Sequence, residues 1–155
     1  MKRIKNFFFA IIVSPEVVLP IIIALSIDFL SPNLTTKIGN LLNTNDDAWK
    51  YLPGLIIAIS IAAFKFTFDL RQPLSNTSNK TLYSWPEYQL LVDRIYISIL
   101  FIGMSCLIGV GLFIFKNQYS HDITGIFFII GMTTSTSTFL TMALALQKLR
   151  EILDR

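Results

Sequence analysis

The sequence predicts an all-α polytopic membrane protein with four transmembrane helices, and three observations support this fold class. Of the 155 residues, 53% are hydrophobic and only 15% are charged, whereas a typical soluble domain has about 25% charged residues. Four apolar segments are each long enough to cross a bilayer, which takes ~20 residues. Lys and Arg are concentrated in alternate connecting segments, as they are in multi-pass membrane proteins.

The four predicted spans cover residues 7–30, 52–70, 95–115 and 123–146 and form one transmembrane domain. Residues 147–155 are expected to continue the fourth span as a cytoplasmic helical tail. In the outer loop, helical spacing of apolar residues after Ser31 and Pro32 predicts an amphipathic helix on the membrane surface. The third helix is expected to open at Pro86 and Glu87, and Asp122 is expected to cap the fourth.

A helix start inside the first apolar segment is indicated by Ser14, Pro15 and Glu16. They supply a capping residue, a first-turn proline and a carboxylate at the positive helix end. This pattern favours a break, with a short basic amphipathic segment over residues 2–13 and a span that begins at Pro15. A single helix from Phe7, kinked at Pro15 and Pro20, is the alternative, and it leaves Glu16 at membrane depth.

The orientation follows from the distribution of the 13 Lys and Arg residues. With a cytoplasmic N-terminus, the outer segments hold only Lys37, Lys50 and Lys116, and the other ten lie on the inner side. This bias predicts that both termini are cytoplasmic. Because topology accounts for the positive net charge, no direct binding of nucleic acid is expected.

Ionisable residues at membrane depth are candidate functional groups. Glu16 and Lys65 are predicted to lie at the same depth near the inner interface on consecutive spans, and Asp69 follows Lys65 by one helical turn. An intramembrane ion pair among these three residues is therefore expected. It could be structural, with Lys65 extending to the inner surface, or it could belong to a proton or ion relay.

The fourth span contains six consecutive hydroxyl residues at positions 133–138. Side chains of this kind either allow close helix packing or line a wetted pore. The candidates for these two roles are Thr133, Thr134, Ser137, Thr138 and Thr141.

Small residues recur at helical spacing in two other spans, at Gly54, Ala58 and Ala62 and at Ser105 and Gly109. Such stripes let helix backbones approach closely, within one chain or between chains. Four helices of this length enclose little interior, which favours a homo-oligomer.

Residues that carry common enzyme chemistry are scarce in this sequence. A single cysteine, Cys106, and a single histidine, His121, exclude an internal disulfide and multi-histidine metal ligation by one chain. No phosphate-binding loop or nucleophile motif occurs, and the cytoplasmic segments are too short for a catalytic domain. We therefore expect no enzymatic activity, no cofactor and no metal.

The predicted tail carries apolar residues at helical spacing: Leu146, Leu149, Ile152 and Leu153. They are expected either to dock a cytoplasmic protein partner, together with the inner loop, or simply to continue the helix along the inner surface.

In helix number and size over its whole length, the chain resembles the membrane subunit of Kiwa-like bacterial antiphage systems. This resemblance implies a multi-pass protein of the bacterial inner membrane and carries no site residues over. The expected function is a non-enzymatic homo-oligomeric scaffold or sensor that holds a cytoplasmic partner. The alternative is a small ion channel or pore-forming effector lined by the Thr/Ser-rich fourth helix.

The predicted topology can be tested with reporter fusions after Asn43, Asn79 and Arg155. We expect an outer signal at the first position and inner signals at the other two, because the Lys and Arg bias sets the orientation. An outer signal at Arg155 would contradict the four-span topology.

Overall fold

The computed structural model describes residues 9–31, 33–71, 80–83, 85–86, 88–115 and 118–153. The helices are α2 (Pro15–Leu30), α3 (Leu34–Thr44), α4 (Asp46–Asp69), α5 (Lys80–Tyr83), α6 (Tyr88–Ile114) and α7 (His121–Leu153). Four helical segments, Phe9–Ile27, α4, α6 and the His121–Glu151 part of α7, are long and apolar enough to cross a membrane. The prediction of an all-α protein with four such helices is therefore confirmed. Of the expected amphipathic segment over residues 2–13, residues 2–8 lie outside the described residues.

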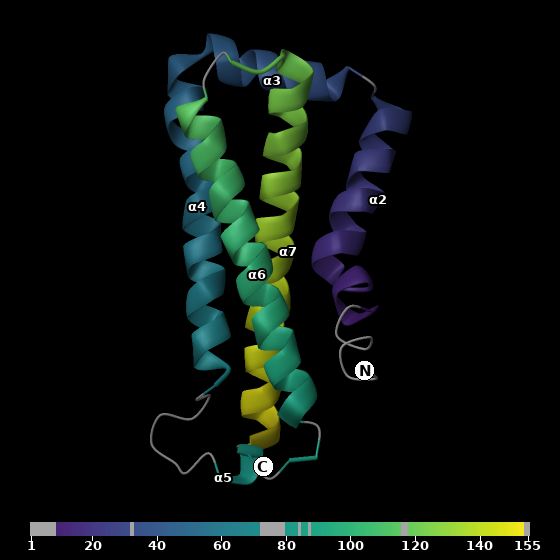
Figure 1. Ribbon diagram of the computed structural model, residues 1–155, viewed down its shortest axis with the longest axis vertical. Helices are drawn as coiled ribbons and strands as arrows, with labels where there is room; N and C mark the ends of the chain where they lie inside the picture. The colour runs from purple at the N-terminus through teal and green to yellow at the C-terminus, as the bar shows by residue number, and fades with distance from the viewer. Residues whose placement is uncertain are drawn as a thin grey trace.

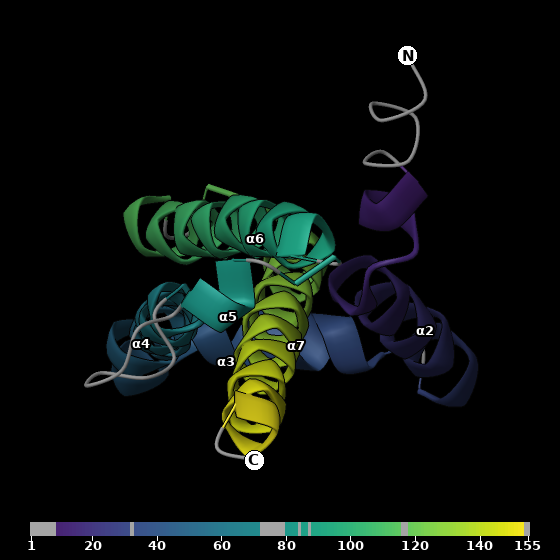
Figure 2. The ribbon, with the colours of Figure 1, turned by 90° about the horizontal axis from the view of Figure 1, so that it is seen from below.

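Helix α7 stands at the centre of the bundle. Figure 2 shows α2 on one side of α7, α4 on the other, and α6 over a third face, and each of these helices contacts α7. Helix α3 lies across one end of the bundle and also packs on α7 (Figure 1). The beginning of α2 and the end of α7 both lie at the end of the bundle opposite α3 (Figure 1). Four candidate spans place the two ends of the chain on the same side in this way.

The local signals for the first two long helices are visible in the backbone. Ser14 is extended, with φ −64° and ψ 144°, and α2 begins at Pro15, so the predicted break is confirmed. Helix α4 begins well before the predicted residue 52. The Asn45 side chain accepts hydrogen bonds from the backbone N–H groups of Asp47 and Ala48 at 3.0 and 3.1 Å, and this cap starts the helix early.

The start of α7 differs from the sequence prediction. Ser120 precedes the helix, and its Oγ accepts from the backbone N–H of Ile123 at 3.4 Å. Asp122 lies inside the first turn, where its carboxylate accepts a hydrogen bond from Thr36 of α3. The prediction that Asp122 caps the helix is therefore wrong, because its side chain holds α3 instead.

The predicted amphipathic helix in the outer loop is present as α3, and its Leu42 side chain is fully buried. Two glycines let the backbones of α3 and α7 touch. A methyl group on Gly39 would lie 1.7 Å from the carbonyl oxygen of His121, and one on Gly125 would lie 2.0 Å from that of Thr35. No other residue fits at either position without moving a backbone.

Buried residues of α4 and α6 recur at alternating intervals of three and four, the spacing that faces one neighbouring helix. At this seam Gly109 of α6 meets the Pro53 carbonyl and Ile57 of α4, and Gly131 of α7 meets Ile56 and Ile108. The seam residues of the first two helices are Trp49, Pro53, Ile56, Ser60, Ala63 and Thr67 in α4, and Ile95, Ser98, Ile102, Ser105, Gly109 and Leu112 in α6.

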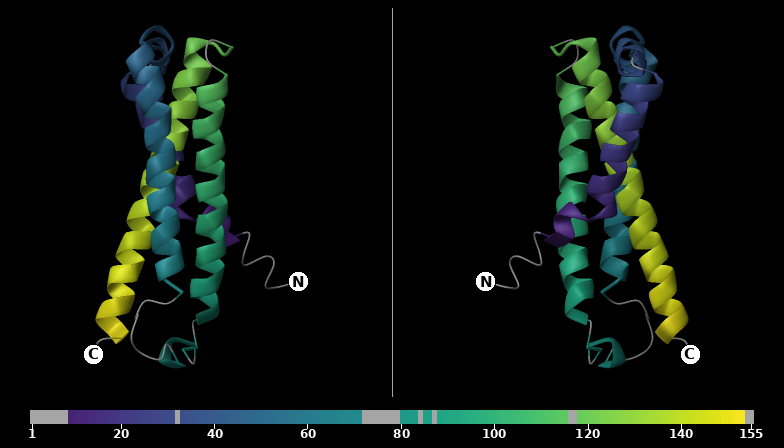
Figure 3. Two further views of the ribbon diagram at one scale, coloured as in Figure 1. Left: turned by 90° about the vertical axis from the view of Figure 1, so that its left-hand side faces the viewer. Right: turned by 90° about the vertical axis from the view of Figure 1, so that its right-hand side faces the viewer.

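Away from α3, α6 and α7 diverge (Figure 3), and an apolar cluster lies at this end of the bundle. Its members are Leu70, Leu82, Ile95, Met142, Leu146 and Leu149. The prediction that Leu146 and Leu149 form a docking face is therefore wrong: they are 4% and 7% exposed because the chain covers its own tail. The side chains of Ile152 and Leu153 lie outside the described residues.

Replacement of Gly39 or Gly125 by Ala is expected to destabilise the protein by about 1–3 kcal/mol, since the added methyl group forces α3 and α7 apart. Thermal unfolding in detergent measures the loss. Gly103→Ala is the matched control, because no residue of the described segments lies within 4 Å of a methyl group there. Unchanged stability of the Gly39 and Gly125 variants would show that the two helices are not in contact.

Candidate functional site

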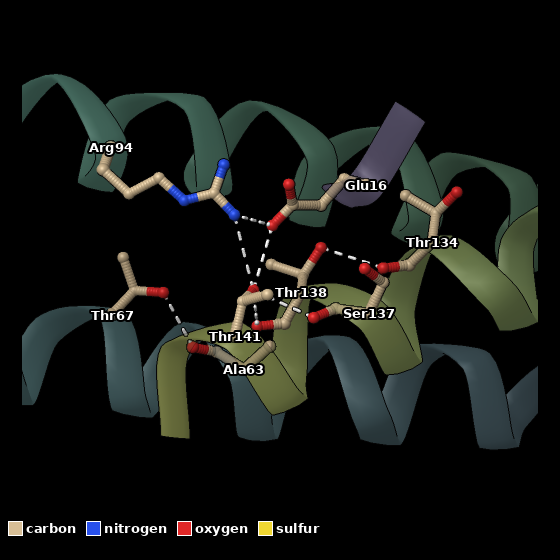
Figure 4. A network of polar contacts seen from close by, with 8 residues as sticks. All are labelled: Glu16, Ala63, Thr67, Arg94, Thr134, Ser137, Thr138 and Thr141. Carbon is tan, nitrogen blue, oxygen red and sulfur yellow. Dashed lines mark hydrogen bonds and ion pairs between the residues drawn. The ribbon is translucent and has the colours of Figure 1, made fainter. Parts of the chain in front are cut away.

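A buried ion pair joins three helices near the start of α2. Figure 4 shows Glu16 of α2 between Arg94 of α6 and Thr141 of α7. Glu16 Oε1 accepts from Arg94 Nη2 at 2.5 Å and from Thr141 Oγ1 at 3.1 Å. The Glu16 side chain is 0% exposed and the Arg94 side chain 26%. This cluster, called here the Glu16 site, is a charged contact between α2 and the rest of the bundle.

Local sequence places Glu16 at this point. Pro15 and the extended Ser14 fix the helix start, so Glu16 lies in the first turn, where the helix dipole favours a negative charge. Glu16 and Pro20 are both buried and lie one turn apart, on the face of α2 that meets the bundle. Arg94 lies in the second turn of α6 and reaches Glu16 across the space between the two helices.

The hydrogen bonding of the Glu16 site is incomplete. Oε1 receives both donors, whereas Oε2 is buried and has no hydrogen-bond partner among the described residues. Within the same part of the chain, the buried hydroxyls of Ser14 and Ser137 have no partner either. An unsatisfied buried polar atom costs about 1–3 kcal/mol. The Glu16 site could therefore form further hydrogen bonds that the described residues do not supply.

The predicted pairing of Glu16 with Lys65 is wrong. Lys65 is exposed on α4, and α7 separates α4 from α2, so the two side chains belong to different sides of the bundle. Asp69 is half-buried near the end of α4, where it borders a hollow with Phe68, Arg71, Tyr83 and Tyr88.

Arg94 is one of the ten inner-side charges, and the sequence pattern alone did not assign it to this ion pair. The available signal was the expected helix opening at Pro86 and Glu87, which places Arg94 inside a helix on the inner side, as Glu16 is; the helix begins at Tyr88.

The hydroxyl run of α7 lies inside the bundle. Thr134, Ser137 and Thr138 are at most 6% exposed, and Thr133 and Thr141 are half-buried. Four hydroxyls donate to carbonyls of their own helix, among them Thr133 to Ile129 at 2.7 Å, Thr138 to Thr134 at 2.8 Å and Thr141 to Ser137 at 2.9 Å. The run therefore packs against neighbouring helices, and a pore along it would require those helices to separate.

The two small-residue stripes have different surroundings. Ser105 and Gly109 are buried in the seam between α6 and α4. Gly54 and Ala58 are exposed, and Ala62 is half-buried; no described residue lies within 4 Å of a methyl group at Gly54. The chain therefore uses the α6 stripe internally and leaves most of the α4 stripe on its surface.

A cavity of about 250 Å³ lies beside the Glu16 site, between α2, α6 and α7. Glu16, Ser105 and Thr134 contribute polar groups to a lining that is otherwise apolar. Within the part of the chain that the structure describes, no group of three or more His, Cys, Asp or Glu side chains is placed to hold a metal ion.

No protein-family model matches the chain, and no curated protein or solved structure is significantly similar to it. Function is therefore inferred from the geometry of the chain alone.

Glu16→Ala is expected to destabilise the protein by about 2–3 kcal/mol, below the range for a fully buried pair because Arg94 keeps some contact with solvent. Unfolding by SDS titration in mixed micelles measures the change. A double-mutant cycle with Arg94→Gln should give a coupling above about 1 kcal/mol.

Lys65→Ala is the matched control for this cycle, with an expected change within about 0.5 kcal/mol. Equal effects of the Lys65 and Arg94 variants, or no coupling between Glu16 and Arg94, would contradict the observed pairing.

Proposed function

We propose that the protein is a non-enzymatic membrane scaffold or sensor that works as a homo-oligomer, with the outer face of α4 as the contact between copies. The observation that carries the proposal is the exposed stripe of Gly54 and Ala58, with Ala62 at its edge. Stripes of this kind let two helix backbones approach closely in lipid. Here the described residues of the chain place nothing within 4 Å of a methyl group at Gly54.

The other candidate surfaces for association are already occupied within the chain. The Thr/Ser run of α7 is enclosed by α2, α4 and α6, and the Ser105 stripe packs on α4. On α4, by contrast, the apolar side chains of Leu55 and Ile61 are exposed next to the stripe. They can pack around a closely approaching second helix, which supports α4 rather than α7 as the interface.

A cytoplasmic partner is the second part of the proposal. If the Lys and Arg distribution orients the protein as predicted, the end opposite α3 faces the cytoplasm and presents the exposed Arg71, together with Lys148, which pairs with Glu151 of the same helix at 2.8 Å. An acidic surface on a partner would complement the charge of Arg71. A membrane protein that binds a cytoplasmic partner in this way could be the membrane component of an antiphage system, which would hold its effector at the membrane.

The interface is tested by cysteine crosslinking in a Cys106→Ser background. Ala58→Cys is expected to give a disulfide-linked dimer under mild oxidation, because two α4 helices that cross at the stripe bring the two sulfur atoms within bonding distance. Non-reducing electrophoresis of membranes measures the product.

Leu107→Cys is the control for this experiment, because Leu107 is exposed on α6, away from the α4 stripe. Native mass spectrometry should show an oligomer that Ala58→Leu weakens. A monomer by mass spectrometry, or equal crosslinking at both cysteines, would refute α4 as the contact.

A further inference from the structure

The cavity beside the Glu16 site has the size and walls of a binding site for a small lipophile. Val17 and Ile21 of α2, Phe101 and Met104 of α6 and Ile130 of α7 form apolar walls around about 250 Å³. A dry cavity of about 150 Å³ holds benzene, which has six carbon atoms. In proportion to volume, this cavity holds a hydrocarbon group of about ten carbon atoms. Apolar walls with a few placed polar groups are typical of ligand sites.

The polar atoms of this cavity specify what the ligand must carry. Glu16 lines the cavity, and the bonds to Glu16 drawn in Figure 4 all reach its Oε1, whereas its buried Oε2 has no hydrogen-bond partner among the described residues. Ser105 also lines the cavity, and in the same part of the chain its buried Oγ has no partner either. A carboxylate oxygen only accepts hydrogen bonds, so the missing group at Glu16 is a donor.

The charge of the site selects a neutral donor over a cation. Arg94 already neutralises Glu16, so a ligand ammonium would bring a second positive charge into an apolar space without an anion of its own. A hydroxyl adds no charge and still forms a strong hydrogen bond to an ionised acceptor.

We propose that this cavity binds a neutral lipophilic alcohol. The hydroxyl donates to Glu16 Oε2, and the hydrocarbon body lies between α2 and α6 against Phe101 and Ile130. The ligand contacts α2 and the two helices that hold it, so its binding stabilises the docked position of α2. This inference does not depend on oligomer formation.

The test is photolabelling of the full-length protein in detergent with a diazirine-bearing octanol, with the labelled residues mapped by mass spectrometry. We expect label on the lining residues Met104 and Ile130. Unlabelled 1-octanol should compete about tenfold better than octyl methyl ether, which has the same chain length but cannot donate a hydrogen bond to the carboxylate. Competition by a diacylglycerol would identify a bilayer lipid as the source of the hydroxyl, and competition by 1-octanol alone a free alcohol.

Three variants separate binding from folding. Ile130→Trp fills the cavity and should abolish labelling, whereas Leu140→Trp, at an exposed position of the same helix, should leave it unchanged. Glu16→Gln removes the charge on the acceptor and should weaken labelling about tenfold. Equal competition by the alcohol and the ether, or labelling that survives Ile130→Trp, would overturn the proposal. Equal competition would mean that hydrocarbon fills the cavity unselectively or that only water reaches Glu16. Labelling that survives Ile130→Trp would mean that the probe does not bind in this cavity.

Discussion

Close approach to α7 is the constraint on which the rest of the structure depends. Three long helices and α3 all contact this one helix, so its side chains must be small where those helices pack against it. Gly125, Gly131 and the hydroxyl run of residues 133–138 meet that requirement. Hydroxyls can lie in this apolar interior where they donate to carbonyls of their own helix, as those of Thr133, Ser135 and Thr138 do.

The Glu16 site takes its character from the same arrangement. Thr141 is one turn beyond Ser137 on α7, so the small-residue face that receives α2 also supplies a hydroxyl to the carboxylate of Glu16. A charge at this depth is expensive unless it is paired and hydrogen-bonded. The pair with Arg94 therefore ties α2 to the bundle at one point, and the adjoining cavity leaves space between α2 and α6 beyond that point.

The Glu16 site could be predicted only in part. Its depth, the helix start at Pro15 and the need for a cation all follow from the residues around Glu16. The residues around Glu16 do not determine whether Lys65 or Arg94 is that cation. Both lie on long helices that follow α2 in the chain, and both lie at a suitable depth. That choice depends on which helix stands between the others, and here α7 separates α2 from α4.

The sequence by itself determined the number of long apolar helices, the break at Ser14, the amphipathic α3 and the extension of α7 to Leu153. These features depend on local composition, capping and periodicity, which neighbouring residues fix. Only the tertiary structure decided that the Ser105 stripe is internal while Gly54 and Ala58 are exposed, and that the tail leucines cover an apolar cluster. The physical reason is that a helix pattern gives the depth and the face of each residue, whereas the identity of the helix against that face depends on how all the helices pack together.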